Sequence, residues 1–133
     1  MPISYQPILS KDQLKKSYTF LWSDGKNLVL ALTRAYYYWP KHLEIDDVWL
    51  QEKCRGVSVN GNKLSFVFMK RVIAKIWKLF PDAIKLSLIV AANNIAAIKL
   101  YEKLGFEIVK RNVKRSQLNI QNGFAMIRHK RSY

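Results

Sequence analysis

Residues 94–106 read NIAAIKLYEKLGF, and this stretch decides how the rest of the sequence is interpreted. Asn94 is of a residue type that caps the start of a helix, and Gly105 is of the type that ends one. Between them, apolar side chains recur at the three- and four-residue spacing of one helical face. The stretch therefore predicts a helix whose apolar face consists of Ile95, Ile98, Leu100, Tyr101 and Leu104.

The segments next to this helix are expected to be strands. Residues 84–90, IKLSLIV, form a short apolar run before it. After it, residues 106–109 and 124–128 have the composition of a last strand pair, joined by a polar and basic connection. Short apolar runs bounded by polar segments are typical of strands in a packed sheet.

A second helix is expected over residues 62–79. Its start could be capped by Ser58 or Asn60, and Pro81 lies just beyond its end. Its periodic apolar residues are Leu64, Val67, Phe68, Val72, Ile76 and Leu79.

The N-terminal third of the chain is rich in β-forming residues. Residues 17–23 and 27–39 predict a hairpin around Asp24-Gly25. Residues 42–50, HLEIDDVWL, predict a third strand whose apolar phase shifts after Ile45, as a β-bulge would produce. The expected order is β-β-β-α-β-α-β-β, which is an α/β (α+β) fold with a mixed central sheet and helices on both faces.

The bulk composition limits the class of protein. A chain of 133 residues is the size of one domain, expected over residues 1–133. Its single cysteine, Cys54, fits a reducing compartment and is interpreted as a packing residue. The N-terminus lacks the order of a signal peptide, and no apolar run approaches the ~20 residues of a membrane span. The sequence therefore predicts a cytoplasmic protein without a membrane anchor.

Two motifs resemble those of the GNAT superfamily of acyl-CoA-dependent N-acyltransferases, over a cofactor-binding half at residues 43–109. The family pattern Asn-x-x-Ala-x-x-Leu-Tyr-x-x-x-Gly-Phe is matched by Asn94, Ala97, Leu100, Tyr101, Gly105 and Phe106. The family's preceding loop, Arg/Gln-x-x-Gly-x-Gly/Ala, is matched at Arg55, with Ser58 and Asn60 at its glycine positions. A register shifted by one residue fits Gly61 but places Gly56 where arginine is expected.

The resemblance implies a compact, N-terminally shortened acetyltransferase with acetyl-CoA as co-substrate and no metal. The bulge would separate the two central strands for the pantetheine arm, and an amide near Leu50 would hold the thioester carbonyl. Asn94 would hydrogen-bond the pantetheine. The implied coenzyme-A-binding residues are Val48, Trp49, Leu50, Arg55, Gly56, Val57, Ser58, Val59, Asn60, Gly61, Asn94, Ala97 and Tyr101.

The implied reaction moves an acetyl group to a primary amine by direct attack. Tyr101 would protonate the departing thiolate, although its place on an apolar helical face fits plain core packing too. The amine needs a general base, for which Glu44 and Asp46 are the candidates and Asp47 the reserve. These acids fit equally well as solvent-facing strand residues. His42 and His129 each stand alone, so the sequence predicts no metal site.

The net charge of +14 leaves other functions open. No acidic residue follows Glu107, whereas seven basic residues do: Lys110, Arg111, Lys114, Arg115, Arg128, Lys130 and Arg131. A basic surface keeps a protein soluble, and it also fits a nucleic-acid-binding module built on the same scaffold. A third reading is an inactive protein that still binds coenzyme A.

The acceptor side departs from the family, because about forty residues precede His42. At most one short helix, at Ser10 to Lys16, is expected there in place of the family's helical pair. Either the acceptor cleft is open to a large substrate or another subunit of a homodimer completes it. The aromatic run Tyr36, Tyr37, Tyr38 and Trp39 would form its floor or a dimer patch, unless it serves only sheet packing.

Overall fold

The computed structural model describes residues 4–6, 17–23, 29–38 and 41–130. The chain divides into two compact units, of which the first comprises Met1–Tyr37 and Ile45–Pro81 and the second Tyr38–Glu44 and Asp82–Tyr133. The expected single domain stays a prediction, as does the expectation that the helices cover both faces of one sheet. None of the described helices is long and apolar enough to cross a membrane.

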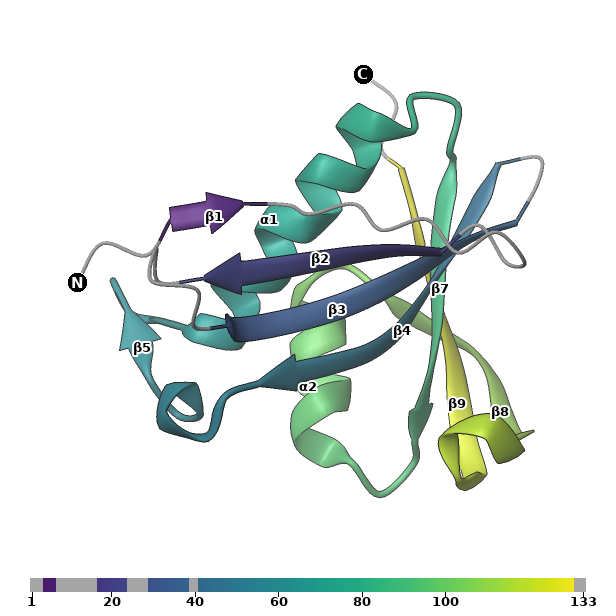
Figure 1. Ribbon diagram of the computed structural model, residues 1–133. Coiled ribbons are helices and arrows are strands. Elements are labelled where there is room, and N and C mark those ends of the chain that lie inside the picture. The colour runs from purple at the N-terminus through teal and green to yellow at the C-terminus, as the bar shows by residue number, and fades with distance from the viewer. Residues whose placement is uncertain (1–3, 7–16, 24–28, 39–40, 131–133) are drawn as a thin grey trace. The chain divides into compact units, whose positions relative to one another are not determined.

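The first unit contains a meander of antiparallel strands, β1 (Ser4–Gln6), β2 (Ser17–Ser23) and β3 (Val29–Tyr38) (Figure 1). The pairing of β2 with β3 confirms the two strands of the predicted hairpin. Strand β1 was not predicted, because three residues are too few to show an alternating pattern. The Asp24-Gly25 turn, the Ser10–Lys16 segment and Trp39 lie outside the described residues.

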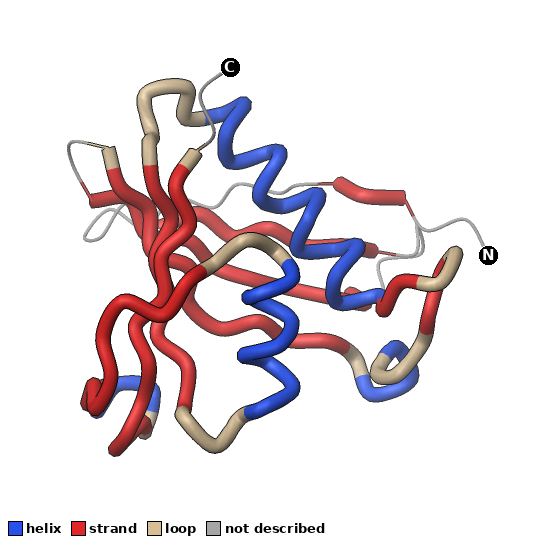
Figure 2. The backbone as a smooth tube through the Cα atoms, turned by 180° about the vertical axis from the view of Figure 1, so that it is seen from behind, coloured by secondary structure: helices blue, strands red, loops and turns tan. Residues whose placement is uncertain are grey.

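The face of this hairpin next to helix α1 (Leu64–Leu79) combines large side chains on β2 with small ones on β3. Phe20 lies opposite Thr33 and Trp22 opposite Ala31, and all four are buried. The Trp22 ring stacks on Phe68 of α1 at 5.8 Å between centroids. Figure 2 shows α1 lying across these strands, which the small β3 side chains permit.

The start of α1 differs from the prediction. Asn62-Lys63 form a short strand, β6, that pairs with β5 (Ser58–Val59), and the helix begins two residues later than expected. Asn60 and Gly61 make the turn between them at φ 51° and 82°. Asn-Gly is the pair that favours such a hairpin turn. Ser58 and Asn60 therefore do not cap α1, and the prediction of a cap from either residue is wrong.

In the second unit, the first residues of β4 (His42–Leu50) run parallel to β7 (Lys85–Ala91), with His42 opposite Lys85 and Glu44 opposite Ser87. Antiparallel pairing continues to β9 (Ile120–His129) and then to β8 (Glu107–Arg115), so the order is β4-β7-β9-β8. This confirms a mixed sheet. Helix α2 (Ile95–Lys103) connects β7 to β8 and confirms the helix from which the sequence interpretation began.

The last two strands are longer than predicted. The residues expected to form a polar connection belong to β8 and β9, and only a short 3₁₀ helix, η2 (Ser116–Leu118), joins them. Strand β8 is the last in the strand order and mostly exposed. Its lysines and arginines hide the apolar alternation by which strands are recognised in a sequence.

Burial along β4 changes partway through the strand. Leu43 and Ile45 are buried, Val48 and Leu50 are half-buried, and Trp49 is 41% exposed. This change falls where the sequence pattern shifts. The β-bulge that was inferred from the shift stays a prediction.

Candidate functional site

A pocket of about 370 Å³ opens in the first unit where β4 ends and α1 begins. Its walls come from the last residues of β4, the connection that follows, and the first turn of the helix. The lining residues are Val48, Trp49, Leu50, Cys54, Arg55, Gly56, Val57, Lys63, Leu64 and Ser65.

Hydrogen bonds fix the strand end that forms one wall. The amide of Gln51 donates to the carbonyl of Leu30 at 2.8 Å. The Nε of Arg55 donates to the carbonyl of Leu50 at 3.2 Å. The peptide unit between Leu50 and Gln51 is thus held from both sides, which fixes the direction in which the neighbouring backbone groups point.

The connection after β4 brings the chain back to the start of the helix. A single turn of 3₁₀ helix, η1 (Glu52–Cys54), follows the strand, and Gly56 at φ 75° reverses the chain. The carbonyl of Val57 then accepts the amide of Leu64 at 2.9 Å. A left-handed φ is strained for other residue types, so the sequence needs glycine at this position.

The first turn of α1 is not closed by its own side chains. The residue at the cap position is Lys63, and no side-chain hydrogen bond caps the helix. The amide of Ser65, one residue into the helix, has no carbonyl one turn earlier to bond. Ser65 lines the pocket, so the positive end of the helix dipole is next to the cavity.

The charged side chains of the pocket have one sign. Arg55 and Lys63 line it, and no aspartate or glutamate does. Both cations are exposed, and neither forms an ion pair with any residue that the structure describes. Two cations and a helix N-terminus around one cavity can bind an anion such as a diphosphate.

The predicted coenzyme-binding residues of the first unit divide into two groups. Val48 to Leu50 and Arg55 to Val57 line the pocket, whereas Ser58 to Gly61 form the hairpin and are not part of the lining. The sequence interpretation missed Lys63 and Ser65, because the helix was expected to begin earlier. A correct helix start is the signal that would have found them. Cys54 is buried, as its interpretation as a packing residue required.

Helix α2 of the second unit carries the remaining predicted residues. The Oδ1 of Asn94 accepts the amide of Ala97 at 3.2 Å, which confirms that Asn94 caps this helix. Its side-chain amide nitrogen still carries two hydrogens for a ligand. Tyr101 is 9% exposed and its ring meets Phe106 edge to face at 5.9 Å, so it packs in the core.

The candidate bases on β4 have different surroundings. In the second unit, Glu44 Oε1 accepts a hydrogen bond from Arg115 Nη2 at 3.0 Å, and the Glu44 side chain is only 15% exposed. Glu44 is therefore not the solvent-facing residue of the alternative interpretation. Asp46 belongs to the first unit and is half-buried. The side chain of Asp47 is outside the described part of the chain.

His42 has a partner that the sequence did not indicate. Its Nε2 lies 2.5 Å from Ser87 Oγ on the neighbouring strand. Burial lowers the pKa of His42, the charge of Lys85 lowers it further, and Glu44 opposes both. The imidazole is consequently neutral near pH 7. Within the described residues, no group of three or more His, Cys, Asp or Glu side chains has the arrangement of a metal site.

Comparisons with known proteins identify this arrangement of strands and helices. Residues 2–106 match the model of the acetyltransferase (GNAT) family. The ribosomal-protein-S18-alanine N-acetyltransferase of Escherichia coli superposes with a TM-score of 0.68 at 20% identity, covering 88% of this chain and 71% of that one. An acetyltransferase of Bacillus subtilis in complex with CoA gives 0.67 at 14% identity, covering 86% and 77%.

Spermidine N-acetyltransferase of Vibrio cholerae, in complex with CoA and spermine, gives a TM-score of 0.69 at 19% identity, with 85% of this chain and 65% of that one covered. The chain thus spans about two thirds of the length of that enzyme. Identities this low show a shared fold and leave the substrate undetermined. No curated protein matches the sequence significantly. The family match covers most of the chain, and the chain belongs to the GNAT acetyltransferase family.

Proposed function

We propose that the protein is an N-acetyltransferase that moves an acetyl group from acetyl-CoA to a primary amine. The observation that carries the proposal is the pocket between the end of β4 and the start of α1, with Arg55 and Lys63 in its lining and no carboxylate. We infer a cytoplasmic location as well, which the free and buried Cys54 supports.

The residues of the pocket fit the diphosphate of coenzyme A. The amide of Ser65 and the side chains of Arg55 and Lys63 offer donors and positive charge to one anion. A Cβ placed on Gly56 would meet nothing within 4 Å, so the backbone there is open to a ligand. In the second unit, the side-chain amide of Asn94 would donate to the pantetheine while its oxygen caps α2.

The chemistry assigned to the protein has three parts. A backbone amide near Leu50 stabilises the negative charge that develops on the thioester oxygen when the amine attacks. Arg55 keeps this strand end in place through its bond to the Leu50 carbonyl. Tyr101 donates its phenolic proton to the departing thiolate, and a general base removes the proton that the amine loses.

Glu44 and Asp46 are the two candidates for that base. Glu44 accepts a hydrogen bond from Arg115 and belongs to the second unit. Asp46 belongs to the same unit as the pocket and precedes Val48 by two residues, a separation of about 7 Å along a strand. One or two water molecules would connect the Asp46 carboxylate to an amine bound beside Val48.

Calorimetric titration with acetyl-CoA, followed by a thioester-consumption assay with added amines, tests the proposal. Tyr101→Phe keeps the ring that packs on Phe106 and removes the hydroxyl, so we expect kcat to fall ~10- to 100-fold with little change in KM. Tyr18→Phe, at a ring that meets Phe80 edge to face, is the matched control.

Two results would contradict the proposal in different ways. Absence of acetyl-CoA binding at hundreds of micromolar would reject the enzyme altogether. Tight binding without amine-dependent thioester loss would instead identify an inactive coenzyme-A-binding protein. Equal turnover in Tyr101→Phe and the parent would remove Tyr101 as the acid.

A further inference from the structure

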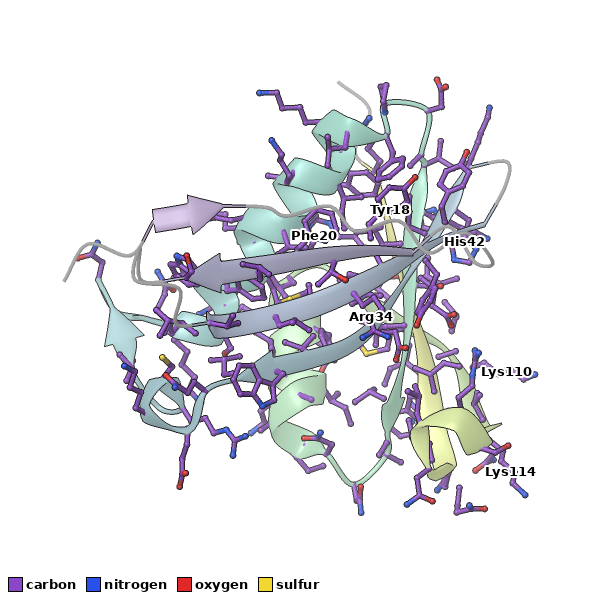
Figure 3. The ribbon with its side chains drawn as sticks, viewed as in Figure 1. Tyr18, Phe20, Arg34, His42, Lys110 and Lys114 are labelled. Carbon is purple, nitrogen blue, oxygen red and sulfur yellow. The ribbon has the colours of Figure 1, made fainter. Side chains whose placement is uncertain are left out.

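The hairpin formed by β8, η2 and β9, residues 107–130, is strongly basic and is called the basic hairpin below. It contains six lysines and arginines, and Glu107 is its only acidic residue. Lys110, Arg111 and Lys114 are exposed. Figure 3 shows the side chains of Lys110 and Lys114 extending away from the strand. These three side chains give the hairpin an exposed positive surface.

Protection of a sheet edge does not account for this much charge. Charged side chains or a bulge prevent an edge strand from pairing with another chain. Strand β8 already has three register shifts against β9, and Asn112 adopts a left-handed φ of 58°. The edge is therefore irregular enough to prevent such pairing, and the additional cations need another explanation.

An ion pair connects the basic hairpin to β4. Arg115, the last residue of β8, bonds to Glu44 at 3.0 Å, with side-chain exposures of 34% and 15%. Glu44 lies opposite Ser87 in the parallel part of the sheet and two residues before Asp46. A ligand lying along the basic hairpin therefore reaches Glu44, one of the two candidate bases.

The surface of the basic hairpin suits a peptide better than single-stranded nucleic acid. Unspecific binding of nucleic-acid strands relies on exposed aromatic rings for base stacking. Phe124 is half-buried, and the guanidinium of Arg111 lies 4.9 Å from its ring centroid. The exposed apolar residues there are Val109, at 56%, and Leu118, at 37%. Aliphatic side chains between cations complement a peptide with acidic and apolar residues.

We propose that the basic hairpin is the docking surface for the acceptor, and that the acceptor is an acidic peptide segment of a protein that presents its amine near Glu44. The inference rests on the proposed function for the chemistry and adds the class of substrate. Polyamines, which are themselves cations, are repelled by the same surface.

The experiment measures peptide binding by fluorescence anisotropy on the full chain. The probe is a ten-residue peptide with a free amino terminus, four glutamates and a C-terminal label, and its matched control has glutamines at the same positions. We expect the glutamate peptide to bind about 10-fold more tightly at low salt, with a difference that shrinks as salt is added.

Two double variants with the same change in net charge locate the surface. Lys110→Gln with Lys114→Gln removes two cations from the basic hairpin and should weaken the glutamate peptide about fivefold. Lys70→Gln with Lys78→Gln removes two exposed cations from α1 and should change the affinity less than twofold. Circular dichroism melting of the parent and the two double variants confirms that each variant is folded.

Each remaining outcome overturns the inference. Equal losses in the two double variants would mean that the overall charge attracts the peptide. If the glutamine peptide binds as tightly as the glutamate peptide, the partner is not an acidic peptide. If a single-stranded RNA decamer binds more tightly than the glutamate peptide, the basic hairpin is a nucleic-acid surface. The assay needs no acetyl transfer, so failure of acetyl-CoA to bind would reject the proposed function without deciding the docking surface.

Discussion

The two helices begin in different ways, although each follows a strand and a short connection. At α2, Asn94 Oδ1 accepts the amide of Ala97, and the amide of Ile95 donates to the Asn93 carbonyl at 3.1 Å. At α1, the cap position holds Lys63 and no side chain caps the helix. The first helix start therefore lines a cavity with positive charge, whereas the second is closed by its own residues.

The difference shows how one structural element serves two purposes. A capped start contributes to stability because its amides are bonded within the protein. An uncapped start gives up that stabilisation and keeps an amide for an anion. In this protein the uncapped start also has Arg55 and Lys63 beside it. We therefore expect substitutions at the start of α1 to change mainly the binding of acetyl-CoA, and substitutions at the start of α2 to change mainly the stability of the fold.

The largest effect is expected from a carboxylate placed inside the pocket. Ser65→Glu puts a negative charge about 5 Å from the expected diphosphate, and repulsion of about 3 kcal/mol would weaken acetyl-CoA ~100-fold. The same change should raise the free energy of unfolding by ~0.3–1 kcal/mol, because an acidic side chain suits the first turn of a helix. Calorimetry and chemical denaturation measure the two effects.

Ala96→Glu is the matched control, because Ala96 is exposed and has the same position in α2 that Ser65 has in α1. It should give a similar gain in stability and a much smaller loss of binding. Comparable losses of affinity in both variants would show that the two helix starts do not differ as proposed.

The second prediction exchanges the caps. Asn94→Ala removes the cap of α2 and should lower the free energy of unfolding by ~1 kcal/mol. Lys63→Asn gives α1 the cap that it lacks and removes a cation from the pocket, so stability should rise by several tenths of a kcal/mol while acetyl-CoA affinity falls about fivefold. A Lys63→Asn protein that binds acetyl-CoA as tightly as the parent would exclude this helix start from the site.

The third prediction concerns the effect of inorganic pyrophosphate alone on hydrogen exchange at the two helix starts. If the start of α1 binds the diphosphate, pyrophosphate should slow hydrogen exchange at the Ser65 amide several-fold. The Ala97 amide, which already donates to Asn94, should not change. Mass spectrometry with and without pyrophosphate measures both segments in one experiment. Equal protection of the two, or of neither, would contradict the comparison.

The smallest expected effect is a pH dependence of stability that arises from His42, which belongs to the same unit as α2. Burial lowers the pKa of His42, so the unfolded chain binds a proton at a higher pH than the folded chain. The stability that neutral His42 contributes is present near pH 7 and is lost as the pH falls below about 6.5 towards the folded value. Chemical denaturation between about pH 7 and pH 5 should show a shallower loss in His42→Gln. An unchanged slope would exclude His42 as the cause.

Much of the fold was predictable because it depends on neighbours in the sequence. The helix at 94–106 was recognised from the spacing of Ile98, Tyr101 and Leu104 and from the cap at Asn94. The β2–β3 hairpin was recognised from residue composition. The prediction was wrong at two places where one local sequence signal outweighed another. Asn60-Gly61 made a hairpin where a helix start was expected, and the cations of β8 concealed a strand.

The candidate site was predicted only in part, for a related reason. Val48 to Leu50 and Arg55 to Val57 were assigned to the coenzyme through family resemblance, and they line the pocket. Lys63 and Ser65 were missed, because their role depends on where α1 begins. The roles of Tyr101, Asn94 and Asp46 in binding or catalysis stay predictions that the variants above would test.

The sequence by itself determined the two helices and the longer apolar strands, because the period of apolar residues and the caps act over a few residues. Only the tertiary structure decided which distant side chains meet. Arg115 reaches Glu44 from 71 residues away, and Ser87 reaches His42 from 45 residues away. Such contacts depend on strand order and register, which no local pattern encodes. For the same reason, the cavity beside Arg55 became visible only once the end of β4 and the start of α1 were brought together.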